Sequence, residues 1–225
     1  MSRYRAPVHV VIAGGHGKIA LRLTARLAAR ADIVTSLVRN PDHRADVEQA
    51  GGRPVVVDLE ATTVDDLAPI LSGADAVVFA AGAGPGSGAA RKDTVDRAAA
   101  VLLAEAALAA GVQRYLLVSS TGVDDPPRPG TDEVWAAYLA AKKAAEEAVR
   151  ASALAWTILR PGALTDDPGT GRVLLAPPPV PRAEVTRDDT AAVLVALLDT
   201  PATAGQVLEL RAGDTDVDKA VRADR

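Results

Sequence analysis

A glycine-rich turn between an apolar run and an amphipathic segment constrains the fold of this chain more than any other feature. Residues 8–13 are almost all apolar, and the segment after Gly17 alternates apolar and basic residues at helical spacing. Between them stand Gly14, Gly15 and Gly17. This order predicts a buried strand, a tight turn and a helix. Glycine lets the turn bend sharply and lets another group approach closely. The free N–H groups at the start of the helix favour an anion such as a pyrophosphate.

The alternation of apolar strands and helices continues along the whole chain. Further strands are expected at 33–38, 54–57, 76–81, 113–118, 155–159 and 206–210, and the longest helix at 132–152, with Thr131 or Asp132 as its cap. Strands that are apolar on both faces are typical of a parallel sheet covered on both sides. The pattern predicts one doubly wound α/β domain over residues 1–225, with about seven mostly parallel strands. Residues 165–185 are expected to form a loop-rich lobe over the site, and residues 213–225 a frayed tail.

Composition excludes several classes of function. The chain has 225 residues, a formal net charge of −4 and no cysteine. This charge balance gives no basic surface for nucleic acid, and no apolar run approaches the roughly 20 residues of a membrane span. The lack of cysteine excludes disulfides and thiolate metal sites, and fits a reducing cytoplasm. The three histidines, His9, His16 and His43, lack the spacing of metal ligands.

Residues that can carry chemistry gather just after the ends of the predicted strands. They are the glycine turn, Arg39, Asp58, Gly82, Ser119 with Ser120, and Arg160. In an open α/β sheet, ligands bind beyond the carboxyl ends of the strands, where the strand order reverses. We therefore expect one ligand site at this edge of the sheet.

The second strand ends in Arg39, at a position where a site for NAD carries an acid. That acid accepts hydrogen bonds from the ribose hydroxyls. An arginine at the same place can hold a 2′-phosphate through charge-assisted bonds. We therefore expect NADP, with NAD as the alternative, although an arginine at a strand end can also be a simple solvated charge.

Four neighbours extend the predicted nucleotide site. Asp58 and Leu59, after the third strand, can accept from the amino group of an adenine and cover its ring. Asp is also common at the turn after a strand. Lys18 either adds positive charge at the glycine turn or is an exposed residue of the first helical turn. His16 either contacts the phosphates or only adopts the backbone conformation of the turn without binding them.

Tyr138 and Lys142 stand four residues apart, on one face of the long predicted helix. A phenol has a pKa near 10, too high for an efficient acid or base at neutral pH. A nearby ammonium stabilises the phenolate and lowers that pKa. Tyr138 can then exchange a proton with a carbonyl oxygen, and Ser120 or Ser119 can hold the same oxygen.

These motifs, in this order, resemble the short-chain dehydrogenase/reductase superfamily, in particular its atypical single-domain NAD(P)H-binding members. The resemblance covers nearly the whole chain. Its motifs are the turn at 14–20, Leu37–Pro41, Val57–Leu59, Ala80–Ala83, Val118–Ser120, Tyr138 with Lys142, Trp156–Gly162 and Val185–Asp189. Ala20 stands in place of the third glycine of the turn. The resemblance implies a Rossmann fold.

The resemblance also assigns roles to single residues. Gly14, Gly17 and Ile19 would hold the pyrophosphate, with Gly15, His16 and Lys18 beside them. Arg39 would meet the adenosine phosphate, and Asp58 and Leu59 the adenine. Ala81, Gly82 and Ala83 would flank the nicotinamide ribose, and Pro161, Gly162 and Leu164 the nicotinamide. Ser120, Tyr138 and Lys142 would be the catalytic set, with Lys142 also binding the ribose.

The leading hypothesis is an NADP-dependent reductase or dehydrogenase acting on a small carbonyl, quinone or related substrate. A second is a regulator of the NmrA-like type, which senses NAD(P) without turnover. A third is a sugar-nucleotide epimerase or dehydratase, for which the 165–185 segment is short. We expect a cytoplasmic monomer or homodimer without metal, nucleic-acid or membrane partners. The loops expected to line the substrate, 84–90, 122–130 and 165–185, carry no readable code.

Overall fold

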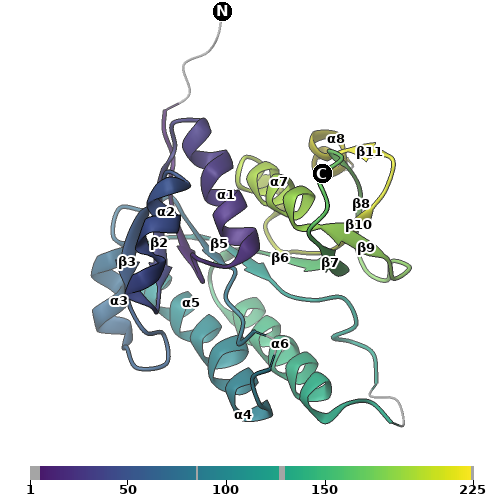
Figure 1. The fold of residues 1–225 in the computed structure, drawn as a ribbon, viewed down its shortest axis with the longest axis horizontal. Helices are drawn as coiled ribbons and strands as arrows, with labels where there is room; N and C mark the ends of the chain where they lie inside the picture. Colours follow the sequence, from purple (N-terminus) through teal and green to yellow (C-terminus); the bar gives the residue numbers. More distant parts are fainter. Residues whose placement is uncertain (1–5, 85, 127–129, 224–225) are drawn as a thin grey trace, which may run out of the picture.

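The computed structural model describes residues 6–84, 86–126 and 130–223, which form a large sheet with helices on both faces (Figure 1). The strands are β1 (His9–Ala13), β2 (Ile33–Val38), β3 (Arg53–Val56), β4 (Ala76–Phe79), β5 (Arg114–Val118), β6 (Ala155–Pro161), β7 (Ala163–Thr165), β8 (Arg172–Ala176), β9 (Glu184–Thr186), β10 (Gln206–Ala212) and β11 (Thr215–Asp216). The helices are α1 (Lys18–Ala29), α2 (Arg44–Gln49), α3 (Val64–Leu71), α4 (Ala89–Arg91), α5 (Ala99–Ala109), α6 (Glu133–Ala151), α7 (Arg187–Leu198) and α8 (Val217–Arg222). Two 3₁₀ turns, η1 (Pro41–His43) and η3 (Pro201–Thr203), and a π-helical segment, η2 (Lys92–Ala98), complete the described elements.

The main sheet has nine strands in the order β11-β8-β10-β6-β5-β4-β1-β2-β3. The strands from β3 to β10 in this order are parallel, while β8 and β11 add an antiparallel edge. β7 and β9 form a separate parallel pair. The doubly wound, mostly parallel fold is confirmed, but the expected count of about seven strands is too low.

The first strand shows why its sequence is apolar without interruption. Val10 and Ile12 pack into one core with residues of α1, α7 and α8, while Val11 and Ala13 pack into a second core with residues of α3, α5 and α6. All four side chains are fully buried. Successive side chains of a strand point to opposite faces, so a strand covered on both faces has no polar side.

The strand order reverses between β1 and β4, which places the ligand crevice at their carboxyl ends. Gly14 follows β1 with φ +78°, and a Cβ built on it would lie 2.5 Å from the Cα of Ala81, just after β4. Glycine is therefore required here by both the backbone conformation and the close approach of the two strand ends.

The 213–225 segment is not a frayed tail over the residues that the structure describes. β11 pairs with β8, and α8 follows with Asp216 as its N-cap. Val217 and Val221 are buried against α7 and β8. The helix has only six residues, so its buried Val217, Ala220 and Val221 give too short a pattern to be recognised in the sequence.

The 165–185 segment also differs from the expected lobe over the site. Its middle forms β8, which extends the sheet beside β10 at the edge away from β1. Prolines before and after β8 hide it in the sequence. Asp166, at the beginning of the segment, does reach the site, since its carboxylate accepts a hydrogen bond from Lys18 at 2.5 Å.

The helical segment between β4 and β5 is irregular. α4, η2 and α5 follow one another without a break, and the wider π-helical turns lie in the middle. Such insertions are frequent at functional sites. Lys92 and Asp96, both on η2, are 8% and 0% exposed.

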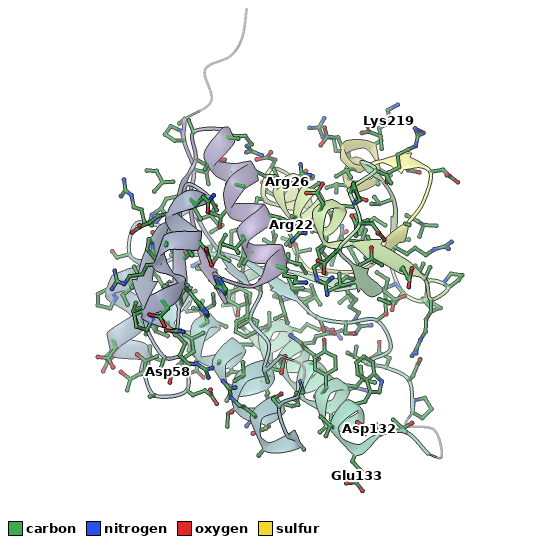
Figure 2. All side chains as sticks on the ribbon, viewed as in Figure 1. Arg22, Arg26, Asp58, Asp132, Glu133 and Lys219 are labelled. Atoms are coloured by element: carbon green, nitrogen blue, oxygen red, sulfur yellow. The ribbon has the colours of Figure 1, made fainter. Side chains whose placement is uncertain are left out.

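Ion pairs join α1 to the C-terminal half of the chain. Arg22 and Arg26 both lie on α1 (Figure 2). Arg26 donates to Asp188 of α7 at 2.8 Å, and Arg22 lies 3.6 Å from Asp166. The loop expected at 122–130 is described except for 127–129, and the one at 84–90 except for residue 85. Across the described ranges, no helix combines the length and the hydropathy needed to cross a bilayer.

Candidate functional site

Two adjoining cavities open at the carboxyl ends of the parallel strands. The first has a volume of about 280 Å³ and lies beside the glycine turn and the ends of β2 and β3. The second has a volume of about 600 Å³ and lies between η2 and α6. Residues 80–83, which follow β4, line both cavities. Together the cavities form a two-part cleft across the point where the strand order reverses.

Most of the predicted cofactor residues line one or both cavities. The first cavity contains Gly14, Gly15, His16, Gly17, Arg39, Asp58, Leu59, Ala81, Gly82 and Ala83. The second contains Ile19, Ala81, Gly82, Ala83, Lys142, Pro161 and Leu164. Lys18 and Gly162, as the structure describes them, belong to neither lining.

The glycine turn presents an uncapped helix start to the first cavity. Gly17 is the N-cap of α1 and offers no side chain to the first helical amides, and the first turn holds no acid. The amides of such a turn need partners, and the helix dipole favours a negative charge there. The turn therefore has the chemistry of a phosphate site.

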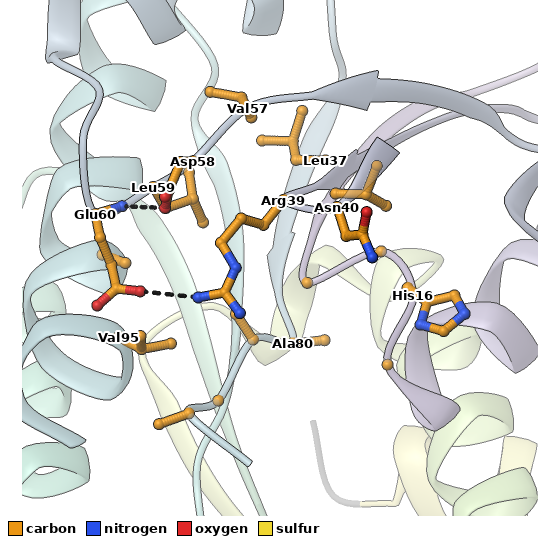
Figure 3. A pocket seen from close by; sticks show the side chains of 18 of the residues that line it. His16, Leu37, Arg39, Asn40, Val57, Asp58, Leu59, Glu60, Ala80 and Val95 are labelled. Carbon is orange, nitrogen blue, oxygen red and sulfur yellow. Dashed lines mark hydrogen bonds and ion pairs between the residues drawn. The ribbon is translucent and has the colours of Figure 1, made fainter. Parts of the chain in front are cut away.

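Arg39 shares a carboxylate with a second arginine that the sequence did not single out. Glu60 lies 3.2 Å from Arg39 (Figure 3). It also lies 2.9 Å from Arg91 of α4, and Thr94 donates to it at 2.6 Å. Both arginines line the first cavity. Two guanidinium groups thus share the carboxylate of Glu60, while the carboxylate of Asp58 also lines this cavity.

The remaining polar residues of the first cavity are engaged by near neighbours. Asp58 accepts from the backbone N–H of Glu60 at 3.0 Å, which closes a local turn. His16 stacks on His43 with ring centroids 3.5 Å apart and bonds Asp46 at 2.7 Å. The apolar wall beside them consists of Leu37, Val38, Val57, Leu59, Val95 and Ala99. This wall forms a slot of the kind that covers an aromatic ring.

Two of the three predicted catalytic residues line the second cavity, while Ser120 is outside its lining and donates its hydroxyl to the carbonyl oxygen of Thr121 at 3.1 Å. Tyr138 and Lys142 line it from α6, beside Trp135, whose ring centroid is 5.1 Å from that of Tyr138. Ser120 forms a side-chain hydrogen bond with Tyr138. Ser119 contributes to the lining, but its hydroxyl donates to Glu146 at 2.5 Å. Of the two serines, Ser120 is the one that contacts the phenol.

The expected fall in the pKa of Tyr138 is not observed. Burial and the charge of Asp96 raise its pKa to about 12, against a small opposing effect of the hydrogen bond from Ser120. Lys142 is not among the groups that shift the pKa of Tyr138, and its own charge is paired with Asp96. At neutral pH, Tyr138 is therefore a protonated phenol that can donate a proton.

Lys142 is held by a buried ion pair. Its ammonium lies 3.2 Å from Asp96 and donates to the carbonyl oxygens of Val118 at 3.1 Å and Ala81 at 3.4 Å. Burial lowers the pKa of Lys142, while Asp96 and Glu146 oppose this effect. The ammonium thus fixes α6 to η2 and to the ends of β4 and β5.

A second network of hydrogen bonds and ion pairs joins β6 to α6 beside the second cavity. Arg160 donates to Glu146 at 2.9 and 2.5 Å and to Asp124 at 2.6 Å, and Glu146 also accepts from Ser119. Gly162 is tightly enclosed, since a Cβ built on it would lie 1.9 Å from the carbonyl oxygen of Ala183. The Arg-Pro-Gly sequence therefore contributes both to the buried network, through Arg160, and to the second cavity, which Pro161 lines.

Sequence reasoning missed Lys92, Asp96, Glu60 and Arg91, although two of them carry a readable signal. Asp96 stands at helical spacing from Ala99, Ala100 and Leu103, which are all buried. A charged residue on the apolar face of a helix needs a partner, and Lys92 precedes Asp96 by one turn. Glu60 and Arg91 lie in polar segments where comparable charges are common, so the sequence gives no signal for them.

Comparison with known proteins agrees with this site. The sequence model of a family described as NAD(P)H-binding matches residues 14–201. Because the match covers most of the chain and includes the glycine turn, this protein belongs to the NAD(P)H-binding family. The resemblance drawn from the motifs is confirmed at this level.

Individual relatives carry different names. A Bacillus subtilis protein called "uncharacterized sugar epimerase YhfK" is 33% identical over 214 residues, which cover 95% of this chain and 98% of that protein. A Bacillus halodurans structure, whose name proposes an NAD-dependent epimerase/dehydratase, is 32% identical with a TM-score of 0.87, covering 95% and 98% of the two chains. ChuY, an anaerobillin reductase from Escherichia coli O157:H7, is 25% identical with a TM-score of 0.75, covering 93% and 99%.

The network between β6 and α6 leads to a prediction about stability. Glu146→Gln should lower the free energy of unfolding by about 3 kcal/mol, because it leaves the buried Arg160 with a weakened partner. Glu147→Gln, at the exposed neighbouring position, should stay within about 0.5 kcal/mol of the unmodified protein. Urea unfolding followed by circular dichroism measures both, and equal shifts for the two variants would contradict the assigned role.

Proposed function

We propose that this protein is an NADP-preferring reductase of small carbonyl compounds. The observation that carries the proposal is the place of Tyr138. It is a protonated phenol, bonded to Ser120, in a cavity that shares the wall 80–83 with the nucleotide-like first cavity. A proton donor beside a dinucleotide cleft is the arrangement that carbonyl reduction requires.

The described residues fit a nicotinamide dinucleotide in one orientation. The uncapped start of α1 suits the pyrophosphate, and the apolar slot formed by Leu37, Leu59 and Val95 suits the adenine. The shared wall leads from there into the second cavity, where Pro161 and Leu164 would border the nicotinamide. When bound, the reduced cofactor supplies a hydride to the carbonyl carbon of the substrate.

The residues of this chain would supply the proton and the orientation. Tyr138 donates its phenolic proton to the carbonyl oxygen as that oxygen becomes an alcohol, and solvent then reprotonates the phenolate. Ser120 hydrogen-bonds the phenol and stabilises the charge left on it. The Lys142–Asp96 pair keeps α6 in place, so the phenol faces the cavity in one position.

The preference for NADP rests on the positive charge near Arg39. Arg39 and Arg91 both face the first cavity and share the single carboxylate of Glu60. A 2′-phosphate carries the negative charge that would complete this cluster, and guanidinium groups bind phosphate with paired hydrogen bonds. NAD offers only a hydroxyl at the same position.

An epimerase is the second candidate, and the names of two relatives favour it. An epimerase would use the same tyrosine, but would return the hydride to its substrate and consume no reduced cofactor overall. A regulator that only senses NAD(P) would bind the cofactor without any turnover. Net oxidation of NADPH therefore separates the reductase from both alternatives.

The first prediction concerns cofactor choice. Arg39→Ala should raise the Kd for NADPH about tenfold and change the Kd for NADH by less than about threefold, because only NADPH carries the 2′-phosphate. Calorimetric titration of both nucleotides measures the two values. Arg53→Ala, which removes an exposed arginine at the start of β3, is the matched control. An equal loss for NADPH and NADH would contradict the preference.

The second prediction concerns the proton donor. The unmodified protein should oxidise NADPH with at least one substrate in a panel of aldehydes, quinones and 2-oxo acids. Tyr138→Phe should reduce that rate about 100-fold or more, the usual range for loss of a general acid, while the Kd for NADPH stays unchanged. Unaltered turnover in Tyr138→Phe would refute the acid role. Tight NADPH binding without turnover across the panel would favour the sensor.

A further inference from the structure

Lys92 is a buried cation that the proposed reaction does not use. It lies on η2, is 8% exposed and lines the second cavity. Its ammonium donates to the carbonyl oxygen of Gly84 at 2.9 Å and lies 5.4 Å from the ring centroid of Tyr138. An ammonium has three hydrogens to donate, so this group can bind more than Gly84.

The other charges of the cavity already have partners. Lys142 is paired with Asp96, and Arg187 lies 3.1 Å from Asp166. Asp132 caps α6 by accepting from the N–H of Trp135 at 2.9 Å. Within the described part of the chain, Lys92 has no carboxylate within ion-pair distance. Asp132 is exposed and holds a backbone N–H instead of a cation, so Lys92 is the buried charge of this cavity that has no ion-pair partner among the described residues.

We propose that Lys92 binds a carboxylate of the substrate, so that the second cavity selects carbonyl compounds that carry a carboxylate near the reacting carbonyl. Burying an ammonium without a counter-charge is costly, and a bound carboxylate removes that cost. The short distance from Lys92 to the ring of Tyr138 places the carboxylate and the reacting carbonyl only a few bonds apart. This inference rests on the proposed function for the identity of the reacting group.

Trp135 adds a preference for a flat apolar group in the substrate. Trp135 lines the same cavity and packs against Tyr138, while its side chain remains partly exposed. A flat apolar body attached to the carboxylate can pack on this ring. Benzoate combines both features in a small probe, and benzamide is the neutral molecule of nearly the same shape.

The experiment measures binding without any nucleotide. The chain has two tryptophans, so Trp156→Phe leaves Trp135 as the one fluorescent reporter. In this background, benzoate should bind at least about tenfold more tightly than benzamide, a difference of about 1.4 kcal/mol. Lys92→Met should abolish that difference, and Lys92→Arg should retain most of it. Lys219→Met, which removes an exposed lysine on the distant α8 (Figure 2), should change neither affinity.

Equal affinity for benzoate and benzamide in the Trp156→Phe background would overturn the proposal, as would unchanged benzoate binding in Lys92→Met. If Lys92→Met does not fold, as judged by circular dichroism, the proposal is tested by comparing benzoate with benzamide in the Trp156→Phe protein and in its Lys92→Arg variant. Turnover is scored separately with a neutral aldehyde. Tighter binding of benzoate than of benzamide without any NADPH oxidation would refute the proposed reductase and support the carboxylate site at Lys92. NADPH oxidation with equal binding of the two probes would support the reductase and refute the carboxylate site.

Discussion

The buried ion pair between Lys142 and Asp96 is the contact on which the arrangement of the candidate site depends. A charge removed from water costs several kcal/mol unless partners surround it. Lys142 meets this requirement with Asp96 and with the carbonyl oxygens of Val118 and Ala81. A single ammonium thereby ties α6 and η2 to the ends of two adjacent strands. The residue one turn earlier on α6, Tyr138, is fixed over the cavity as a consequence.

The same pair sets the charge pattern of the cleft. Burial and the charge of Asp96 raise the pKa of Tyr138, so the phenol remains protonated at neutral pH and can donate its proton. We propose that Arg39 in the first cavity and Lys92 in the second each bind an anionic group of a ligand. The wall 80–83, which lines both cavities, lies between these two positions.

Much of this architecture could be predicted from the sequence, because the responsible signals are local. Apolar runs indicate the parallel strands, and the three glycines indicate the turn. Thr131 or Asp132 indicates the start of α6, and Asp132 is its N-cap in the structure. β8 and α8 were missed because prolines flank the first and the second has only six residues. The pairing of Lys142 with Asp96 could not be predicted, since 46 residues separate them and several acids were equally available. The same holds for Glu60, whose importance depends on which arginines the fold brings beside it.

The central claim is that Tyr138 is a neutral phenol in the ligand-free protein, and carbon-13 NMR of labelled tyrosine tests it most directly. The chain has three tyrosines, and Tyr138→Phe identifies the signal of interest. At pH 10 an ordinary tyrosine is about half ionised. With its pKa raised to about 12, Tyr138 should show about 1% ionisation at that pH, and hence almost no change in the chemical shift of its ring carbon Cζ. A midpoint below pH 10 would contradict the account, because it would mean that burial and Asp96 do not raise the pKa of the phenol.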